Sequence, residues 1–223
     1  FELNEKATTS NASGSVYAGH LYGSWSPQSH DAFYLQSILG LGVTNSKTDR
    51  DIPFLNRTAT SDHDANYYSA FVGGGYKQQT GNWTLKPRAG FEYINLNEDS
   101  FSEHGAQAAA LAIHSKDSEA LVSSLGFEIS HSCDLSNGLL VPSFRADWFH
   151  NFSAQGENTT ATLQSGESFR VEGRKASKDS LELAVGLTVL VSDKLHGTLD
   201  YQYTFADNQN KAHLLSAGLS YCF

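Results

Sequence analysis

Three residues of this sequence could together activate a water molecule. Asp147, His150 and Asp207 combine carboxylates with an imidazole, which is the pairing that general acid–base hydrolysis uses. The nine histidines of the chain, however, fall in no GxSxG, HExxH or P-loop motif. The alternative is that these groups are polar residues at the rim of a sheet. We adopt it and expect no catalytic residue, no metal site, no cofactor and no enzymatic activity.

A second set consists of charges that alternate with apolar residues. Its members are Lys86, Arg88, Glu92, Glu128, Arg145, Asp147, Glu182 and Asp200. Every second side chain of a strand points to the same face, so these charges share one wet face. Residues of opposite charge can neutralise one another within a strand and across to neighbouring strands. They either keep this face hydrated and satisfied or hold another polypeptide segment against it.

Alternating strands must position these charges. In the last twelve residues, Leu215, Leu219, Tyr221 and Phe223 share one face, and serines, Gly218 and Cys222 occupy the other. The same alternation occurs at 83–93, 140–148, 180–191 and 198–205, and we expect further strands at 13–25, 32–48, 62–78 and 117–131, with a stub at 1–5. About ten strands result. Many approach or exceed the roughly 9 to 11 residues that cross a bilayer at a tilt.

The expected connections alternate between short and long. Short polar turns fall at 27–31, 80–82, 134–138 and 192–194, and long links fall at 49–61, 99–116 and 153–176. Outer-membrane barrels have short periplasmic turns and long extracellular loops, so the last strand would end on the periplasmic side. A soluble sandwich or lipocalin-like barrel shows the same alternation, but strand length and aromatic-rich apolar faces favour the membrane barrel. Pro87 and Pro142 lie inside strands, and we expect a bulge at each.

Composition agrees with one all-β domain over residues 1–223. The chain is 39% hydrophobic and 17% charged, with 19 glycines. It has no run of 18 apolar residues, and its mean hydropathy is −0.36. A formal charge of −9 without a basic cluster excludes nucleic acid as a partner.

Cys133 and Cys222 are too few for a disulfide framework, although the sequence still allows a single disulfide between these two cysteines. The start at Phe1, without Met or a signal peptide, suggests a processed product or a fragment.

One ordered set of motifs resembles a known family. The stretch 81–93, GNWTLKPRAGFEY, is similar to the NW-x-L-x-P-x-A-G-(L/F)-x-Y strand of autotransporter β-domains. Ser123–Phe127, Gly138–His150, a closing hairpin and a terminal aromatic follow in the order that this family shows. The resemblance runs from about residue 14 and is clearest from about residue 70.

The resemblance implies an antiparallel transmembrane β-barrel of 12 strands in a bacterial outer membrane, with about ten strands present here. The first strands and the lumen helix would be missing from this chain. Its function would be type V secretion: anchoring an N-terminal passenger and translocating it to the cell surface. Expected partners are outer-membrane lipid, the chain's own passenger and lumen helix, and the outer-membrane assembly machinery.

The resemblance also assigns roles to single residues. Tyr221 and Phe223 would form the C-terminal assembly signal, and Phe223 would also suit an interfacial anchor. The eight alternating charges would line the lumen. Two other functions remain open: a stand-alone porin or adhesin barrel with active loops, and a surface hydrolase barrel that uses the rim residues Asp147 and His150.

Overall fold

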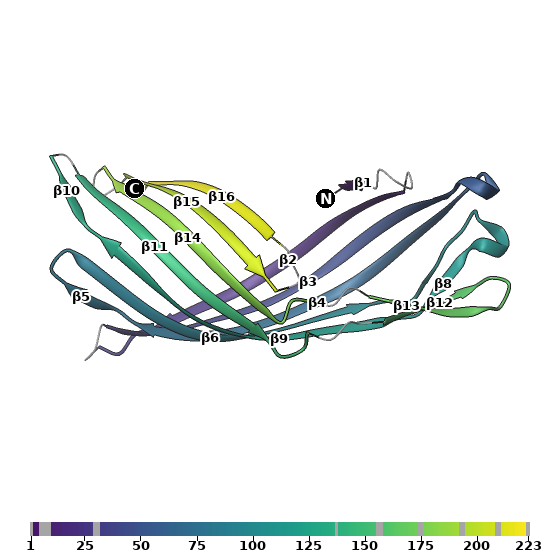
Figure 1. Ribbon diagram of the computed structural model, residues 1–223, viewed down its shortest axis with the longest axis horizontal. Helices are drawn as coiled ribbons and strands as arrows, with labels where there is room; N and C mark the ends of the chain where they lie inside the picture. The colour runs from purple at the N-terminus through teal and green to yellow at the C-terminus, as the bar shows by residue number, and fades with distance from the viewer. Residues whose placement is uncertain are drawn as a thin grey trace.

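The chain folds into one curled antiparallel sheet with a small second sheet at one end (Figure 1). The structure, a computed structural model, describes residues 2–4, 10–28, 32–136, 138–154, 158–173, 176–191, 195–207 and 211–221. The strands of the large sheet are β1 (Glu2–Asn4), β2 (Asn11–Trp25), β3 (Phe33–Ile52), β4 (Arg57–Tyr76), β5 (Gln78–Thr80), β6 (Trp83–Glu98), β9 (Lys116–His131), β10 (Cys133–Leu135), β11 (Gly138–Asn151), β14 (Asp179–Leu190), β15 (Leu195–Ala206) and β16 (Lys211–Tyr221). The expected all-β antiparallel fold is confirmed.

Each strand of the large sheet pairs with its neighbours in sequence. The order β1-β2-β3-β4-β6-β9-β11-β14-β15-β16 contains no crossover, and every pairing is antiparallel. Figure 1 shows an open trough, in which β5, β10 and the C-terminal end of the chain lie at one end. We call this the turn end and the opposite end the loop end. Among the described strands, β1 pairs only with β2, and β16 pairs only with β15.

The distribution of apolar side chains is the reverse of that in a water-soluble protein. Leu125, Val72 and Leu215 are 59%, 58% and 70% exposed, whereas the carboxylate-bearing Asp147 is 4% exposed. The buried hydrophobic residues that the structure describes are Ile52, Ala59, Ala65, Ala106, Ala110, Ala161 and Ala184. Large exposed apolar faces mark surfaces that are covered by something other than water. A barrel whose outer face meets lipid accounts for this distribution. No helix in the described residues has the length and apolar character that a membrane span requires.

The two strand prolines interrupt hydrogen bonding without changing register. On one side, Pro87 pairs with Phe127 in β9. On its other side, the pairing of β6 is interrupted between the end of β4 and the start of β5. Pro142 pairs with Leu187 in β14, and its other flank faces the break between β9 and β10. The pairing resumes in the same register beyond each break. The expected bulges are therefore absent, because the ladder is left open on the side where proline has no N–H to donate.

At the loop end, the segments expected to be irregular are largely ordered. β3 and β4 continue their pairing to Ile52 and Arg57 and are joined by the 3₁₀ turn η1 (Pro53–Leu55), which Asn56 closes in the left-handed conformation. A second sheet, which we call the loop sheet, stands beside this hairpin (Figure 1). It has the order β13 (Ser168–Glu172), β12 (Asn158–Leu163), β8 (Leu111–Ile113) and β7 (Phe101–Ser102).

The loop sheet is fastened to the β3–β4 hairpin. Ile52 and Ala59 pack against Ala106 and Ala110, which flank the 3₁₀ turn η2 (Gln107–Ala109). Beside this cluster, the Arg50 guanidinium donates to both carboxylate oxygens of Glu103 at 2.8 and 2.5 Å. The hydrogen bond to Glu103 raises the pKa of Arg50. The Glu103 carboxylate also accepts a hydrogen bond from the backbone N–H of Leu111 at 2.9 Å. The Glu103 side chain therefore joins the two ends of the segment between β7 and β8 to each other and to Arg50 in β3.

We expect Glu103→Ala to loosen the loop between β6 and β9 while leaving the large sheet intact. The Glu103 side chain is only 7% exposed. Its removal leaves the Leu111 N–H without its acceptor and leaves the Arg50 guanidinium with the Ala109 carbonyl, 3.2 Å from its Nη2, in place of a carboxylate. Losing a charged hydrogen bond of this kind costs about 1.5–3 kcal/mol locally. Limited proteolysis of the folded protein would show faster cleavage within residues 99–115. Cleavage at an unchanged rate in that segment would contradict the role of Glu103.

Candidate functional site

The candidate site is the row of charges on the concealed face of the large sheet. Residues directly opposite in an antiparallel ladder have their side chains on the same face. Register places Tyr34, Gly75, Arg88, Gly126, Asp147 and Glu182 in one row across six strands. Apart from Ile38, the exposed large apolar residues of these six strands occupy alternate positions and therefore lie on the other face. All eight charges expected on the wet face follow the parity of this row.

Asp147 is the centre of the row. Its carboxylate accepts two hydrogen bonds from Arg88, one of them from Nε to Oδ1 at 2.8 Å. Nε of Arg145 lies 3.5 Å from the other oxygen of Asp147, and Nη2 of Arg145 lies 3.3 Å from Glu182 and donates to Gln202 at 3.1 Å. The Asp147 side chain is 5% exposed. Two guanidinium groups therefore stabilise one concealed carboxylate, and paired fork geometry makes the Arg88 contact strong.

Lys86 and Glu128 form a separate ion pair. They face each other directly in the β6–β9 ladder, and Nζ of Lys86 lies 2.8 Å from Oε1 of Glu128. Both side chains are partly exposed, so this pair contributes little to stability. Its effect is that one positive and one negative charge on the wall of the interior neutralise each other.

Glycine leaves the space that the Asp147 carboxylate occupies. Gly126 lies between Arg88 and Asp147 in the row, and a Cβ added there would meet Oδ1 of Asp147 at 2.0 Å and the Ala146 carbonyl at 2.5 Å. At Gly75, an added Cβ would meet the Tyr34 hydroxyl at 2.5 Å. Side chains of one strand thus lie flat across the glycines of the next. Arg88 reaches a carboxylate two strands away because nothing stands between them.

We expect Gly126→Ala to break the Arg88–Asp147 contact. The new methyl group needs the position of the Asp147 carboxylate, and the Ala146 backbone cannot yield as a side chain would. Overpacking of this kind costs about 1–3 kcal/mol. The free energy of unfolding of the detergent-folded protein in urea measures the effect. Gly19→Ala is the matched control, because a Cβ at Gly19 meets nothing within 4 Å. An equal loss in both variants would show that the carboxylate does not need this space.

Beside the ion pairs lies a cavity of about 220 Å³. Its lining combines Arg88, Arg145, Asp147 and Glu182 with the rings of Tyr34 and Phe149. Sequence reasoning did not single out Tyr34, Phe149 or Gln202. Parity does place Gln202 on this face, two residues from Asp200, and could have placed Phe149 there too, because Phe149 is two residues from Asp147.

Comparison with known proteins identifies the fold. A family model described as "Autotransporter beta-domain" matches residues 2–202, nearly the whole chain. The chain belongs to the autotransporter β-domain family. The resemblance seen in the motifs is thereby confirmed, and with it the location of this β-domain in the outer membrane of a Gram-negative bacterium. A search of curated proteins returned no match.

Two solved autotransporter β-domains are similar in structure. One is the translocator domain of the autotransporter NalP from Neisseria meningitidis, with a TM-score of 0.73 and 18% identity over 96% of this chain and 69% of that one. The other is the β-domain of the Bordetella autotransporter BrkA, with a TM-score of 0.63 and 17% identity over 96% of this chain and 75% of that one. At these identities, the likeness establishes the fold of the autotransporter β-domain and leaves residue roles to this chain's own geometry.

The residues proposed for water activation do not come together in this autotransporter β-domain. Asp147 points to the concealed face with Arg88, whereas His150 is three residues further on and lies on the opposite face. Nδ1 of His150 lies 2.9 Å from Oδ1 of Asp179, and the same oxygen accepts a hydrogen bond from Nε1 of Trp148 at 3.0 Å. Asp207 caps the start of β14 by accepting the backbone N–H of Asp179 at 3.3 Å. The rim interpretation fits His150 and Asp207, and Asp147 is an interior ion-pair residue instead.

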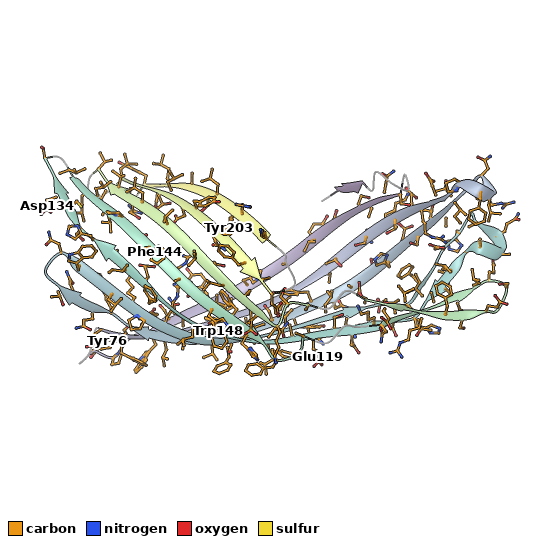
Figure 2. All side chains as sticks on the ribbon, in the orientation of Figure 1. Tyr76, Glu119, Asp134, Phe144, Trp148 and Tyr203 are labelled. Carbon is orange, nitrogen blue, oxygen red and sulfur yellow. The ribbon has the colours of Figure 1, made fainter. Side chains whose placement is uncertain are left out.

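The remaining expected positions of the β-domain are placed as follows. Tyr221 ends β16 at the turn end, while Cys222 and Phe223 lie outside the described residues. Cys133 begins β10 as a free cysteine, with its Sγ 3.1 Å from Nδ1 of His131. No group of three or more metal-binding side chains occurs in the described part of the chain. Figure 2 shows side chains on both faces of the sheet, with Asp134 labelled at its turn end and Trp148 labelled near the middle of the view.

Proposed function

We propose that this β-domain anchors an N-terminal passenger in the outer membrane and translocates it to the cell surface. The observation that carries the proposal is the family match over residues 2–202 on a sheet whose apolar face points outward. Outer-membrane lipid is the partner of that outer face. The loop end, with its long β3–β4 hairpin and its loop sheet, is the extracellular side, and the short turns near β5 and β10 face the periplasm.

The interior is the partner surface for the chain's own passenger and lumen helix. Polar and charged groups there form hydrogen bonds with water and with a polypeptide that touches the wall, whereas apolar side chains would not. The ion pairs Arg88–Asp147 and Lys86–Glu128 keep the net charge in the middle of this wall close to zero. We assign the eight alternating charges the role of a hydrated contact surface and assign the domain no catalytic chemistry.

The last strand is the proposed contact with the outer-membrane assembly machinery. Tyr221 and Phe223 have the alternating aromatic spacing that the family resemblance associates with recognition, and Tyr221 is 54% exposed at the turn end. Substituting Tyr221 and Phe223 by Ala tests this assignment. Slower appearance of the folded species in the membrane at unchanged expression would support the assignment, and an unchanged rate would refute it.

The proposed function is tested in cells that express the full gene product. External protease on intact cells should remove the passenger, and unheated protein should migrate anomalously on SDS gels because the folded barrel resists the detergent. Deleting residues 83–223 from the gene product should leave the passenger inside the cell. A passenger that reaches the surface without these residues would refute the proposal, as would a stable open pore with no polypeptide inside, which would favour the porin alternative.

A further inference from the structure

A second cavity lies against the other wall of the interior. It measures about 360 Å³ and is lined by His20, Ile38, Tyr67, Ser69, Phe71 and Glu92. Register places Tyr22, Ile38, Phe71 and Glu92 in one row across β2, β3, β4 and β6. Glu92 stands at the border between this aromatic wall and the charged wall that begins at β6. The cavity therefore combines aromatic rings with one carboxylate.

The wall formed by β2, β3 and β4 carries no acidic or cationic side chain other than histidine at the level of this cavity. Its inward positions are Val16, Ala18, His20, Tyr22 and Ser24 in β2, Tyr34, Gln36, Ile38, Gly40 and Gly42 in β3, and Tyr67, Ser69, Phe71, Gly73 and Gly75 in β4. No lysine or arginine of the described residues forms an ion pair with Glu92. The interior bases Lys86, Arg88 and Arg145 are all engaged with other carboxylates.

A carboxylate in this setting selects its ligand by charge. A second anion would be repelled, and an apolar group would remove water from the carboxylate without replacing its hydrogen bonds. A lysine or arginine side chain would satisfy the carboxylate with a charge-assisted hydrogen bond. The faces of Tyr67 and Phe71 add the attraction of a cation for an aromatic ring. The chemistry of the cavity therefore points to an ammonium or guanidinium group.

The position of Glu92 fits a segment on its way out of the barrel. It is the tenth residue of β6, counted from Trp83 at the turn end, so it lies towards the extracellular mouth of the interior. Asp200 is the other interior carboxylate of the set for which no ion pair is found in the described chain, and it lies over Gly186 in the charged wall. Of the eight alternating charges, three are bases and five are acids, which leaves an excess of negative charge in this set for a basic occupant.

We propose that the Glu92 cavity binds a lysine or arginine side chain of the polypeptide segment that occupies the barrel interior. The segment carries apolar or small residues on the side that faces β2–β4 and its basic residue opposite Glu92. The inference rests on the proposed translocator function, because that function places a polypeptide inside the barrel. It goes further by naming the wall, the pocket and the charge by which the segment is held.

The test uses the purified full-length protein in planar lipid bilayers. Glu92→Arg should release the segment and raise the frequency of conducting events at least tenfold over wild type, with Glu92→Gln intermediate. Asp62→Asn, which removes an exposed carboxylate from the outward face of β4 and not from the interior, should change the frequency less than threefold. Each lysine or arginine of the interior segment is then replaced by glutamate, one at a time, in the Glu92→Arg variant. One of these charge reversals should return the frequency of conducting events to the wild-type level.

Each outcome separates the cavity from the wider proposal. Anomalous gel mobility shows that a variant has folded, and Glu92→Gln, which keeps the side-chain shape, carries the test if Glu92→Arg does not fold. Quiet Glu92→Gln and Glu92→Arg channels, or the lack of any restoring reversal, would overturn the cation pocket while the passenger remains at the cell surface. A wild-type passenger that never reaches the surface would instead refute the translocator function itself.

Discussion

Asp147→Ala should destabilise the barrel more than any other single change in its interior. The substitution removes the carboxylate between Arg88 and Arg145, so Arg88 loses its hydrogen-bond acceptor and Arg145 loses a counter-charge 3.5 Å from its Nε. Breaking a buried ion pair from one side costs about 3–5 kcal/mol. Because each arginine side chain is about a third exposed to water, we expect the lower end of that range. Urea unfolding of the detergent-folded protein, followed by gel mobility, gives the free energy directly.

Asp200→Asn is the matched control for Asp147→Ala. It removes an interior carboxylate of the same kind, but one with no ion pair in the described chain, so stability should change by less than about 1 kcal/mol. The double variant Arg88→Leu with Asp147→Leu should recover part of the loss, because it removes a charge pair together. A loss in Asp147→Ala no larger than in Asp200→Asn would mean that water, and not Arg88, satisfies Asp147.

Val185→Arg should strongly impair insertion into the membrane. Val185 is 54% exposed in the middle of β14, between Phe144 and Tyr201 on the outward face. In a water-soluble protein, arginine at such an exposed position would change stability by about 0.5 kcal/mol or less. On the lipid face of a barrel, arginine near the bilayer midplane costs about 2–4 kcal/mol. The fraction of folded protein in the outer-membrane fraction measures the effect.

Thr198→Arg serves as the control for Val185→Arg. Thr198 is also exposed, but it faces the interior from β15, where it stands opposite Thr188 and Gly218. An arginine there remains in water, so folded protein should accumulate as in wild type. If Val185→Arg and Thr198→Arg behaved alike, the outward face would not contact lipid, and the assignment of the two faces would fail.

The sequence sufficed to predict the strands that cross the membrane. Alternation is strict where one face meets lipid and the other meets water, so 83–93 and 180–191 were found within a few residues of β6 and β14. Alternation weakens at the loop end, where neither face of the sheet meets lipid. The end of β3 and the start of β4, at 49–52 and 57–61, carry mostly polar residues and were therefore expected as a loop.

The interior charges were predicted as a set but not as pairs. Parity fixes the face of a residue, whereas its partner depends on how far neighbouring strands are shifted, which the turns determine. Arg88 contacts Asp147 across an intervening strand because Gly126 carries no side chain there, and no local pattern announces this. Parity could, however, have excluded the water-activating pair, because Asp147 and His150 are an odd number of residues apart. Their side chains point to opposite faces of β11.

The length of β3 and β4 determines what the surroundings of the cell can recognise. Each strand has 20 residues, and about half suffice to cross the bilayer, so the hairpin stands roughly 30 Å above it at about 3.3 Å per residue. Its tip presents Phe54, which is 85% exposed, on a turn that Asn56 holds closed. Among the described parts of the β-domain, this tip and the loop sheet lie on the proposed extracellular side. The ordered hairpin is therefore a surface that an antibody could bind while the barrel stays in the membrane.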